Sequence, residues 1–274
     1  MIWKGIKLEF YRAFHNIWYV GALLAATAIA LVQFFAMVMP KTVAIGSGDS
    51  IDYPHSVFNS SLMFCLGSFY DEIFYLSIIL LATVPYAASY YMDVKEGYIK
   101  NISTRMDTTG YLMGKYLAVF VSAGSICAIP LILNTYLTAM VLPSLKPEIA
   151  TAVFPVIKGS FAQELFYTYP YLYTLLYIVI DFIMAGLYGC LALVISKIVN
   201  NRYIVMFFPF VVYLVFRTVI TYTPLEQLSP YYIMDPQQFG TIEEAPYIIS
   251  GMAALFLITA AGFKIAGGKR NDIL

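Results

Sequence analysis

Six apolar stretches, each about as long as a membrane-spanning helix, constrain this chain more than any other feature. A helix needs about 20 apolar residues to cross the hydrocarbon core of a bilayer. The stretches are residues 17–39, 73–92, 113–142, 171–195, 203–222 and 247–266. They are continuous rather than alternating, which favours helices over the strands of a barrel. The chain is 61% hydrophobic and 12% charged, whereas about a quarter of the residues in a soluble domain are charged. We therefore predict an all-α membrane protein, a single six-span transmembrane domain over residues 1–274.

The distribution of lysine and arginine predicts the orientation. With the amino terminus placed inside, the inner side carries twelve of these residues and the outer side carries three. Short inner loops of membrane proteins are enriched in Lys and Arg. We therefore expect a multi-pass protein of a bacterial plasma membrane with both termini in the cytoplasm.

The segment before the first span predicts an interfacial helix. Residues 1–16 are amphipathic, and such helices lie in the plane of the membrane surface. Ile2, Trp3, Ile6 and Phe10 are expected to face lipid. The alternative is a polar lead-in with no fixed position.

Three longer connections are placed outside the membrane, at residues 40–72, 143–170 and 223–246. Prolines divide the second and third of them into short pieces. Because long loops without structure are uncommon in compact proteins, we predict short helices there.

Several kinds of chemistry are excluded by what the chain lacks. It has no glycine-rich phosphate loop that ends in Gly-Lys-Ser/Thr. Its two histidines, His15 and His55, fall on opposite predicted sides of the membrane, so they cannot form a metal pair. The three cysteines show no metal or redox spacing, and the formal net charge is zero. We expect no enzyme activity, no bound cofactor or metal and no nucleic-acid partner.

The densest charge lies in one inner segment, residues 93–112, between the second and third spans. A helix is predicted over Lys95–Ser103 with Asp93 as its cap, although Gly97 would weaken that helix by about 1 kcal/mol. The alternative is a solvated loop whose basic residues only hold the topology.

The order of residues in this segment resembles that of a known family. The pattern is Asp93, Glu96-Gly97, Lys100, Thr104-Arg105 and then Gly114-Lys115 at the start of the third span. It is similar to the cytoplasmic coupling helix of ABC type-2 transporter permeases, and the layout of six spans after an amphipathic helix also fits. The residue-level likeness covers about 25 positions, and the loops at 40–72 and 143–170 are longer than in compact exporters of the family.

The resemblance implies the permease subunit of an ATP-driven exporter. Permeases of this family pair as homodimers or as heterodimers with a related permease. Separate ABC ATP-binding subunits, which carry ATP and Mg, dock beneath them. The residues expected to contact the ATPase are Asp93, Lys95, Glu96, Gly97, Lys100 and Arg105. The substrate is expected to be hydrophobic or amphipathic.

Two other functions use the same features. A membrane anchor or sensor would recruit a cytoplasmic partner through residues 93–105 without transporting anything. A channel would line its pore with polar residues at helical spacing, and we see no such stripe.

Two charges fall within predicted spans. Asp181 lies 16 residues before Lys197, and Arg217 lies 15 residues after Arg202, so both sit about 22–24 Å above the inner boundary at about 1.5 Å per residue. We predict an ion pair that locks the fourth span to the fifth. A role in the translocation path, or an arginine that reaches outer water, is the alternative.

Overall fold

The computed structural model describes residues 2–47, 54–65, 68–99, 108–148, 150, 153, 155–157, 159–223, 226–237 and 245–268. Within these ranges the secondary structure is helical, with no strand. In chain order the elements are α1 (Ile2–Phe14), α2 (Ile17–Gln33), the π-helical η1 (Phe34–Val38), α3 (Met39–Ser47), the 3-10 turns η2 (Val57–Asn59) and η3 (Leu62–Phe64), α4 (Phe69–Thr83), α5 (Ser89–Lys95), α7 (Thr108–Val141), α8 (Gln163–Thr168), α9 (Pro170–Ile195), α10 (Arg202–Thr221), the 3-10 turn η5 (Glu226–Leu228), α11 (Pro230–Met234) and α12 (Ala245–Gly268).

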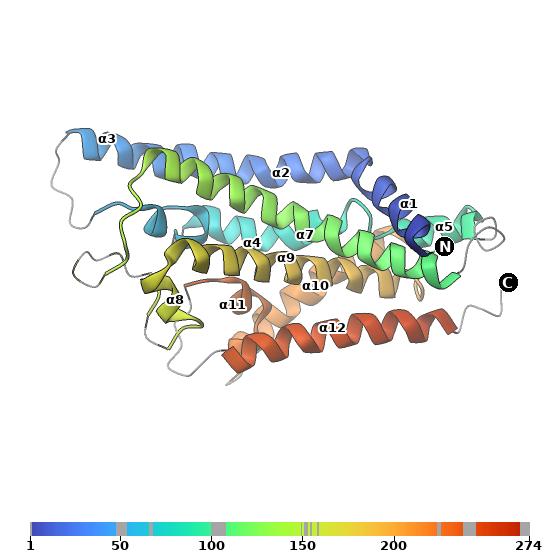
Figure 1. Ribbon diagram of the computed structural model, residues 1–274. Coiled ribbons are helices and arrows are strands. Elements are labelled where there is room, and N and C mark those ends of the chain that lie inside the picture. Colours follow the sequence, from blue (N-terminus) through green and yellow to red (C-terminus); the bar gives the residue numbers. More distant parts are fainter. Residues whose placement is uncertain are drawn as a thin grey trace.

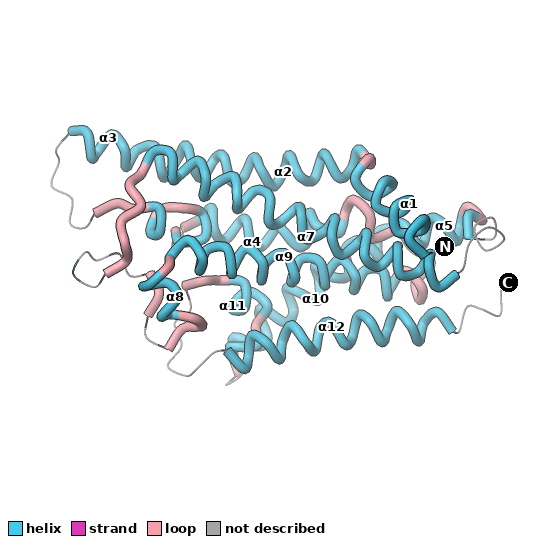
Figure 2. Tube along the Cα trace, in the orientation of Figure 1, coloured by secondary structure: helices cyan, strands magenta, loops and turns pink. Residues whose placement is uncertain are grey.

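The long helices lie roughly side by side in an elongated bundle (Figure 1). We call its two ends the α1 end, where α1 and α5 lie, and the α8 end, where α3 and α8 lie. Figure 2 shows that most of the described loops gather at the α8 end, whereas the turn between α4 and α5 lies toward the α1 end. The carboxyl end of α12 also lies at the α1 end (Figure 1).

Five helices of the described chain are long and apolar enough to cross a membrane. They are Ile17–Val43, Thr109–Val141, Pro170–Ile195, Arg202–Ile220 and Ala245–Lys264. The prediction of an all-α, multi-pass membrane protein is confirmed at this level.

The predicted span at residues 73–92 is not one continuous helix. Here α4 ends at Thr83, residues 84–88 form turns, and α5 begins at Ser89. Pro85 explains the break, because proline has no backbone N–H to donate and its ring clashes with the carbonyl one turn earlier in a continuous helix. The turn leaves the Pro85 carbonyl free to accept a hydrogen bond of 2.7 Å from the Asn16 side chain, just before α2.

Helix α9 is the centre of the bundle. Of its apolar stretch 78% is buried, against 17% for α10 and α12. It packs against α4, α7, α10 and α12. The closest crossing is with α7, where Gly124 faces Phe182 and Gly186 faces Phe120 in a reciprocal arrangement. The two phenylalanine rings meet edge to face at 5.7 Å.

Polar residues within the bundle are bonded between elements. Asn134 on α7 donates to the Gln33 side chain at 2.7 Å and accepts from the backbone N–H of Leu62 at 2.8 Å. Gln33 in turn donates to the Ser60 carbonyl at 3.0 Å. These bonds tie the loop that holds η2 and η3 to α2 and α7.

Helix α1 turns one face toward the bundle and another away from it. Gly5, Glu9 and Ala13 are buried, four residues apart, and this face packs against α7. Trp3 is exposed, as expected for a lipid-facing residue, but Phe10 packs against the core at the α1 end instead of facing away.

Candidate functional site

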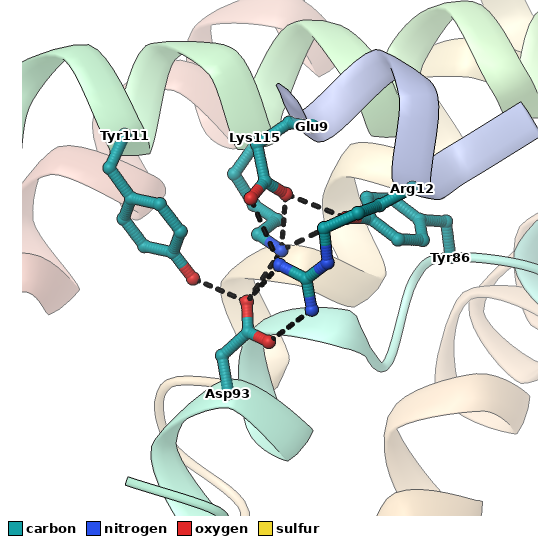
Figure 3. A network of polar contacts seen from close by, with 6 residues as sticks. All are labelled: Glu9, Arg12, Tyr86, Asp93, Tyr111 and Lys115. Carbon is teal, nitrogen blue, oxygen red and sulfur yellow. Dashed lines mark hydrogen bonds and ion pairs between the residues drawn. The ribbon is translucent and has the colours of Figure 1, made fainter. Parts of the chain in front are cut away.

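The most concentrated polar chemistry in the described chain is a network of six side chains at the α1 end. Figure 3 shows four charged groups and two tyrosines converging from α1, α7, α5 and the turn before α5. The members are Glu9 and Arg12 on α1, Tyr86 in the turn, Asp93 on α5, and Tyr111 and Lys115 on α7.

Lys115 is the hub of this network. Its Nζ lies 2.5 Å from Glu9 Oε2 and 2.6 Å from Asp93 Oδ2. It also donates to the hydroxyl of Tyr86 at 3.3 Å. The side chain of Lys115 is fully buried, and those of Glu9 and Asp93 are 1% exposed. One lysine therefore holds together two carboxylates that come from different helices.

Arg12 closes the network on its exposed side. It contacts Asp93 Oδ1 at 2.7 Å and Glu9 Oε1 at 3.0 Å, and its guanidinium lies over the ring of Tyr98 at 4.5 Å. Two acidic and two basic groups make the network neutral. Buried charges need this kind of pairing, because removal from water costs several kcal/mol per ion.

The two tyrosines complete the hydrogen bonding of the carboxylates. Tyr86 donates to Glu9 Oε2 and Tyr111 donates to Asp93 Oδ2, each at 2.6 Å. Hydrogen bonds to charged acceptors are stronger than those between neutral groups. The network joins α1, α5 and α7 and holds these three helices in one arrangement.

Electrostatic interactions keep Arg12 and Asp93 ionised. Burial alone would raise the pKa of the Asp93 carboxyl, but the hydrogen bond from Arg12 and the charge of Lys115 hold it below its usual range. Burial would lower the pKa of Arg12, and the hydrogen bond and charge of Asp93 raise it above its ordinary value. The Arg12–Asp93 pair therefore stays charged across the physiological pH range.

Backbone packing explains how α1 comes so close to α7. A Cβ atom at Gly114 would lie 3.1 Å from the backbone of Gly5, so the two helices touch through residues without side chains. Lys115 follows Gly114 directly, and Glu9 lies one helical turn after Gly5. The close crossing thus brings the ion pair within bonding distance.

A groove of about 560 Å³ opens beside the network. It lies between α1, the start of α2 and α5, and Arg202 at the start of α10 also lines it. Its charged and polar lining includes Arg12, His15, Asn16, Asp93, Glu96 and Arg202. The groove carries both signs of charge.

The predicted partner-contact residues are divided by the structure. Asp93 is buried in the network and lies inside α5, so the prediction that it caps a helix is wrong, whereas its contact with a partner stays a prediction. Lys95 and Glu96 are exposed at the end of α5. Lys100 and Arg105 lie outside the described residues.

The predicted helix does not begin at Lys95: residues 96–97 form a turn, Tyr98 and Ile99 are helical again, and residues 100–103 lie outside the described ranges. Helix α5 covers Ser89–Lys95 and ends there. Gly97 follows with φ +72°, a left-handed conformation that glycine adopts without strain. Asp93 is therefore near the end of a helix instead of before its start.

The predicted ion pair between Asp181 and Arg217 does not form. Arg217 is paired with Glu72 in the first turn of α4 and stacks on the ring of Tyr231 at 4.1 Å. Asp181 Oδ2 instead accepts a hydrogen bond of 3.2 Å from the hydroxyl of Tyr75. The depth estimate did not include the direction in which each side chain points.

The faces of the helices account for this difference. Tyr213, four residues before Arg217, donates to the backbone carbonyl of Tyr75 at 3.0 Å. That face of α10 therefore lies against α4, and one turn further on Arg217 meets Glu72 instead of Asp181.

Reasoning from the sequence did not identify four members of the network as site residues. They are Glu9, Arg12, Tyr86 and Tyr111. Lys115 was noted only as part of the family pattern. Two signals were available. A carboxylate at Glu9 sits on the same stripe as Gly5 and Ala13, and a stripe that carries a charge packs on protein more readily than on lipid. Tyr111 and Lys115 are four residues apart and so share a helix face.

Fold and composition define the class of this chain as an all-helical, multi-pass membrane protein. Comparison with family models, curated proteins and solved structures finds no match.

Proposed function

We propose that this chain is the permease subunit of an ATP-driven ABC exporter, coupled to a separate ATPase subunit at its α1 end. The observation that supports this most directly is the buried charge network, because it joins α1, α5 and the start of α7 into one unit. A force on any of the three elements would move all of them together.

Helix α7 connects that unit to the other end of the bundle. It has 34 residues, which corresponds to about 51 Å at about 1.5 Å per residue. It is therefore longer than the hydrocarbon core of a bilayer, about 30 Å thick. A displacement at the α1 end would reach the α8 end through this helix and through its close crossing with α9.

The proposed ATPase contact is the exposed surface beside the network. Lys95 and Glu96 present charges at the end of α5, and the groove between α1 and α5 adds His15 and Arg202. Lys100 and Arg105, the other predicted contacts, lie outside the described ranges. The Lys/Arg distribution supports a cytoplasmic location of the same end, which ATP-binding subunits with bound ATP and Mg would require.

The remaining parts of the proposal follow the resemblance. Residues 73–92 would form a further crossing as a broken span made of most of α4, the turn at Pro85 and the start of α5. Two copies, or one copy and a related permease, would enclose a path for a hydrophobic or amphipathic substrate. Helices α2, α10 and α12 present exposed apolar faces to lipid or to that second subunit.

The test is purification of the native complex from mild detergent, identification of its subunits and measurement of ATP hydrolysis. We expect an ABC ATP-binding subunit in the complex. Glu96→Lys should lower its ATPase rate or release it. Glu226→Lys makes the same charge change at the exposed η5 turn of the α8 end and serves as the matched control.

Two outcomes would reject the exporter. A complex without any ATP-binding subunit contradicts it directly. A cytoplasmic partner that binds through Glu96 but hydrolyses no ATP would support the membrane anchor instead, since the clamped α1 end serves recruitment equally well.

A further inference from the structure

Asp181 is a buried ionisable side chain that forms no ion pair with the described residues. It is the twelfth of the 26 residues of α9, which places it about 16 Å from one end of that helix and about 21 Å from the other at about 1.5 Å per residue. Its exposed fraction is 0%. It therefore lies deep in the bundle, away from either end.

The groups that face Asp181 are neutral or acidic. The hydroxyl of Tyr75 on α4 donates a hydrogen bond to Oδ2 of Asp181. Oδ1 of Asp181 has no hydrogen-bond partner among the described residues. The Cys127 thiol on α7 and the Tyr213 phenol on α10 are close enough to interact electrostatically with Asp181. Among the described residues, the carboxyls of Asp71 and Asp235, which have the same sign, also act on it.

No cation of the described chain offsets a negative charge at this position. The ion pairs among the described residues involve Glu9, Asp93 and Glu72 but not Asp181. An isolated ionised carboxylate in an apolar interior costs so much that such a group takes up a proton instead. Beside the carboxyl, the two phenols offer too few oxygens for Ca²⁺ or Mg²⁺, which need six or more ligands, and the thiol offers none.

We propose that Asp181 is a proton-binding site, a carboxylic acid that stays protonated in the arrangement seen here and releases its proton when water or a cation reaches it. The proton moves as H⁺ between the carboxyl and water, so no oxidant, reductant or further reactant is needed. A rearrangement of α4, α7 and α9 that opens this position would thereby be linked to pH. This inference does not depend on the proposed exporter function.

The α8 end offers the shorter polar route to Asp181. Asp71 lies one helical turn before Tyr75 on α4 and is 5% exposed. Burial, and then the charges of Asp235 and Glu72, raise the pKa of Asp71 to about 8, and burial raises the pKa of Asp235 to about 6. Acids that exchange protons near neutral pH therefore lie between Asp181 and that end.

The experiment is infrared spectroscopy of the purified protein at neutral pH, in H₂O and D₂O. A protonated carboxylic acid gives a carbonyl stretching band that an ionised carboxylate lacks, and the band shifts in D₂O. We expect Asp181→Asn to remove one component of this band while the helical content stays unchanged, because asparagine is neutral and can still accept from Tyr75.

A second variant keeps the test independent of the folding of Asp181→Asn. The double variant Asp71→Asn, Asp235→Asn removes the other two acids near this site and leaves Asp181 in place. A component of the band should persist in it at neutral pH. Absence of the acid band from this variant, or an acid band in Asp181→Asn equal to that of the wild type, would overturn the proposal.

Discussion

Glu9 on α1 and Lys115 on α7 form an ion pair of 2.5 Å in which neither side chain is more than 1% exposed. The same lysine holds Asp93 at 2.6 Å. Two helices that are about a hundred residues apart in sequence are thus joined by one buried cation. Replacing one member of a buried ion pair lowers stability far more than replacing all of its members, because the remaining charge is then buried without a partner.

Lys115→Met should therefore lower the stability of the protein by about 3–5 kcal/mol, the range for a broken buried pair. Thermal unfolding in detergent, followed by circular dichroism, measures the loss. The double variant Glu9→Gln, Lys115→Met removes the charges of both partners and should recover part of the stability. Lys95→Met is the matched control, since Lys95 is exposed at the end of α5. Equal effects of Lys115→Met and Lys95→Met would show that the network is not buried as described.

Gly124→Ala should weaken the crossing of α7 and α9. Its new Cβ would lie 2.6 Å from the backbone carbonyl oxygen of Phe182, so one helix must shift. Overpacking of this kind costs about 1–3 kcal/mol. A lower midpoint of thermal unfolding in detergent is the expected result.

Gly21→Ala is the control for that substitution. Gly21 also lies within a helix, α2, but nothing lies within 4 Å of the position of its Cβ. Alanine is favoured over glycine inside helices by up to about 1 kcal/mol, so this variant should match the wild type or exceed it. A Gly124→Ala protein as stable as Gly21→Ala would contradict the close crossing.

The long apolar helices could be predicted from the sequence because each depends on a local property. An apolar run of the right length predicts a span whatever elements pack against it. Four of the five observed helices closely follow the predicted bounds. The first, Ile17–Val43, continues beyond the predicted end at residue 39. Pro85 is also a sequence signal for the break between α4 and α5, but hydropathy alone predicts one continuous span there. The short helices α8 and α11 fall in the loops where prolines predicted them.

The candidate site could not be predicted because it depends on which faces meet. Asp93 is hydrophilic and follows an apolar run, so composition placed it in solvent. Its burial follows from Lys115 and Arg12, which approach from two other helices. For the same reason equal depth did not pair Asp181 with Arg217: the rotation of α10 about its axis, set by the packing of Tyr213 against α4, is not visible in hydropathy.

An exchange of charges tests the observed partner of Arg217. Arg217→Glu places an acid beside Glu72 and should lower stability by about 1 kcal/mol, because partly exposed pairs contribute up to about that much. The double variant Arg217→Glu, Glu72→Arg restores opposite charges at the same positions and should recover the loss, as read from unfolding midpoints. Arg217→Glu combined with Asp181→Arg should recover nothing. Recovery by that second combination would reinstate the pair that the structure lacks.

The pH dependence of stability should carry the signature of Asp71 at the α8 end. Burial, with the charges of Asp235 and Glu72, raises its pKa from 3.8 to about 8, so the folded protein holds this proton more tightly than the unfolded chain does. The stabilising contribution is then fully present below about pH 4 and is lost as the pH rises toward 8, by at most roughly 1.4 kcal/mol per pH unit. Asp71→Asn has no proton to lose and should be more stable than the wild type at pH 8, with a flatter profile between pH 6 and 8. Glu226→Gln, an exposed acid at the same end, should leave the wild-type profile unchanged. A wild-type protein whose unfolding midpoint rises between pH 6 and 8 would show that Asp71 is ionised in the folded state.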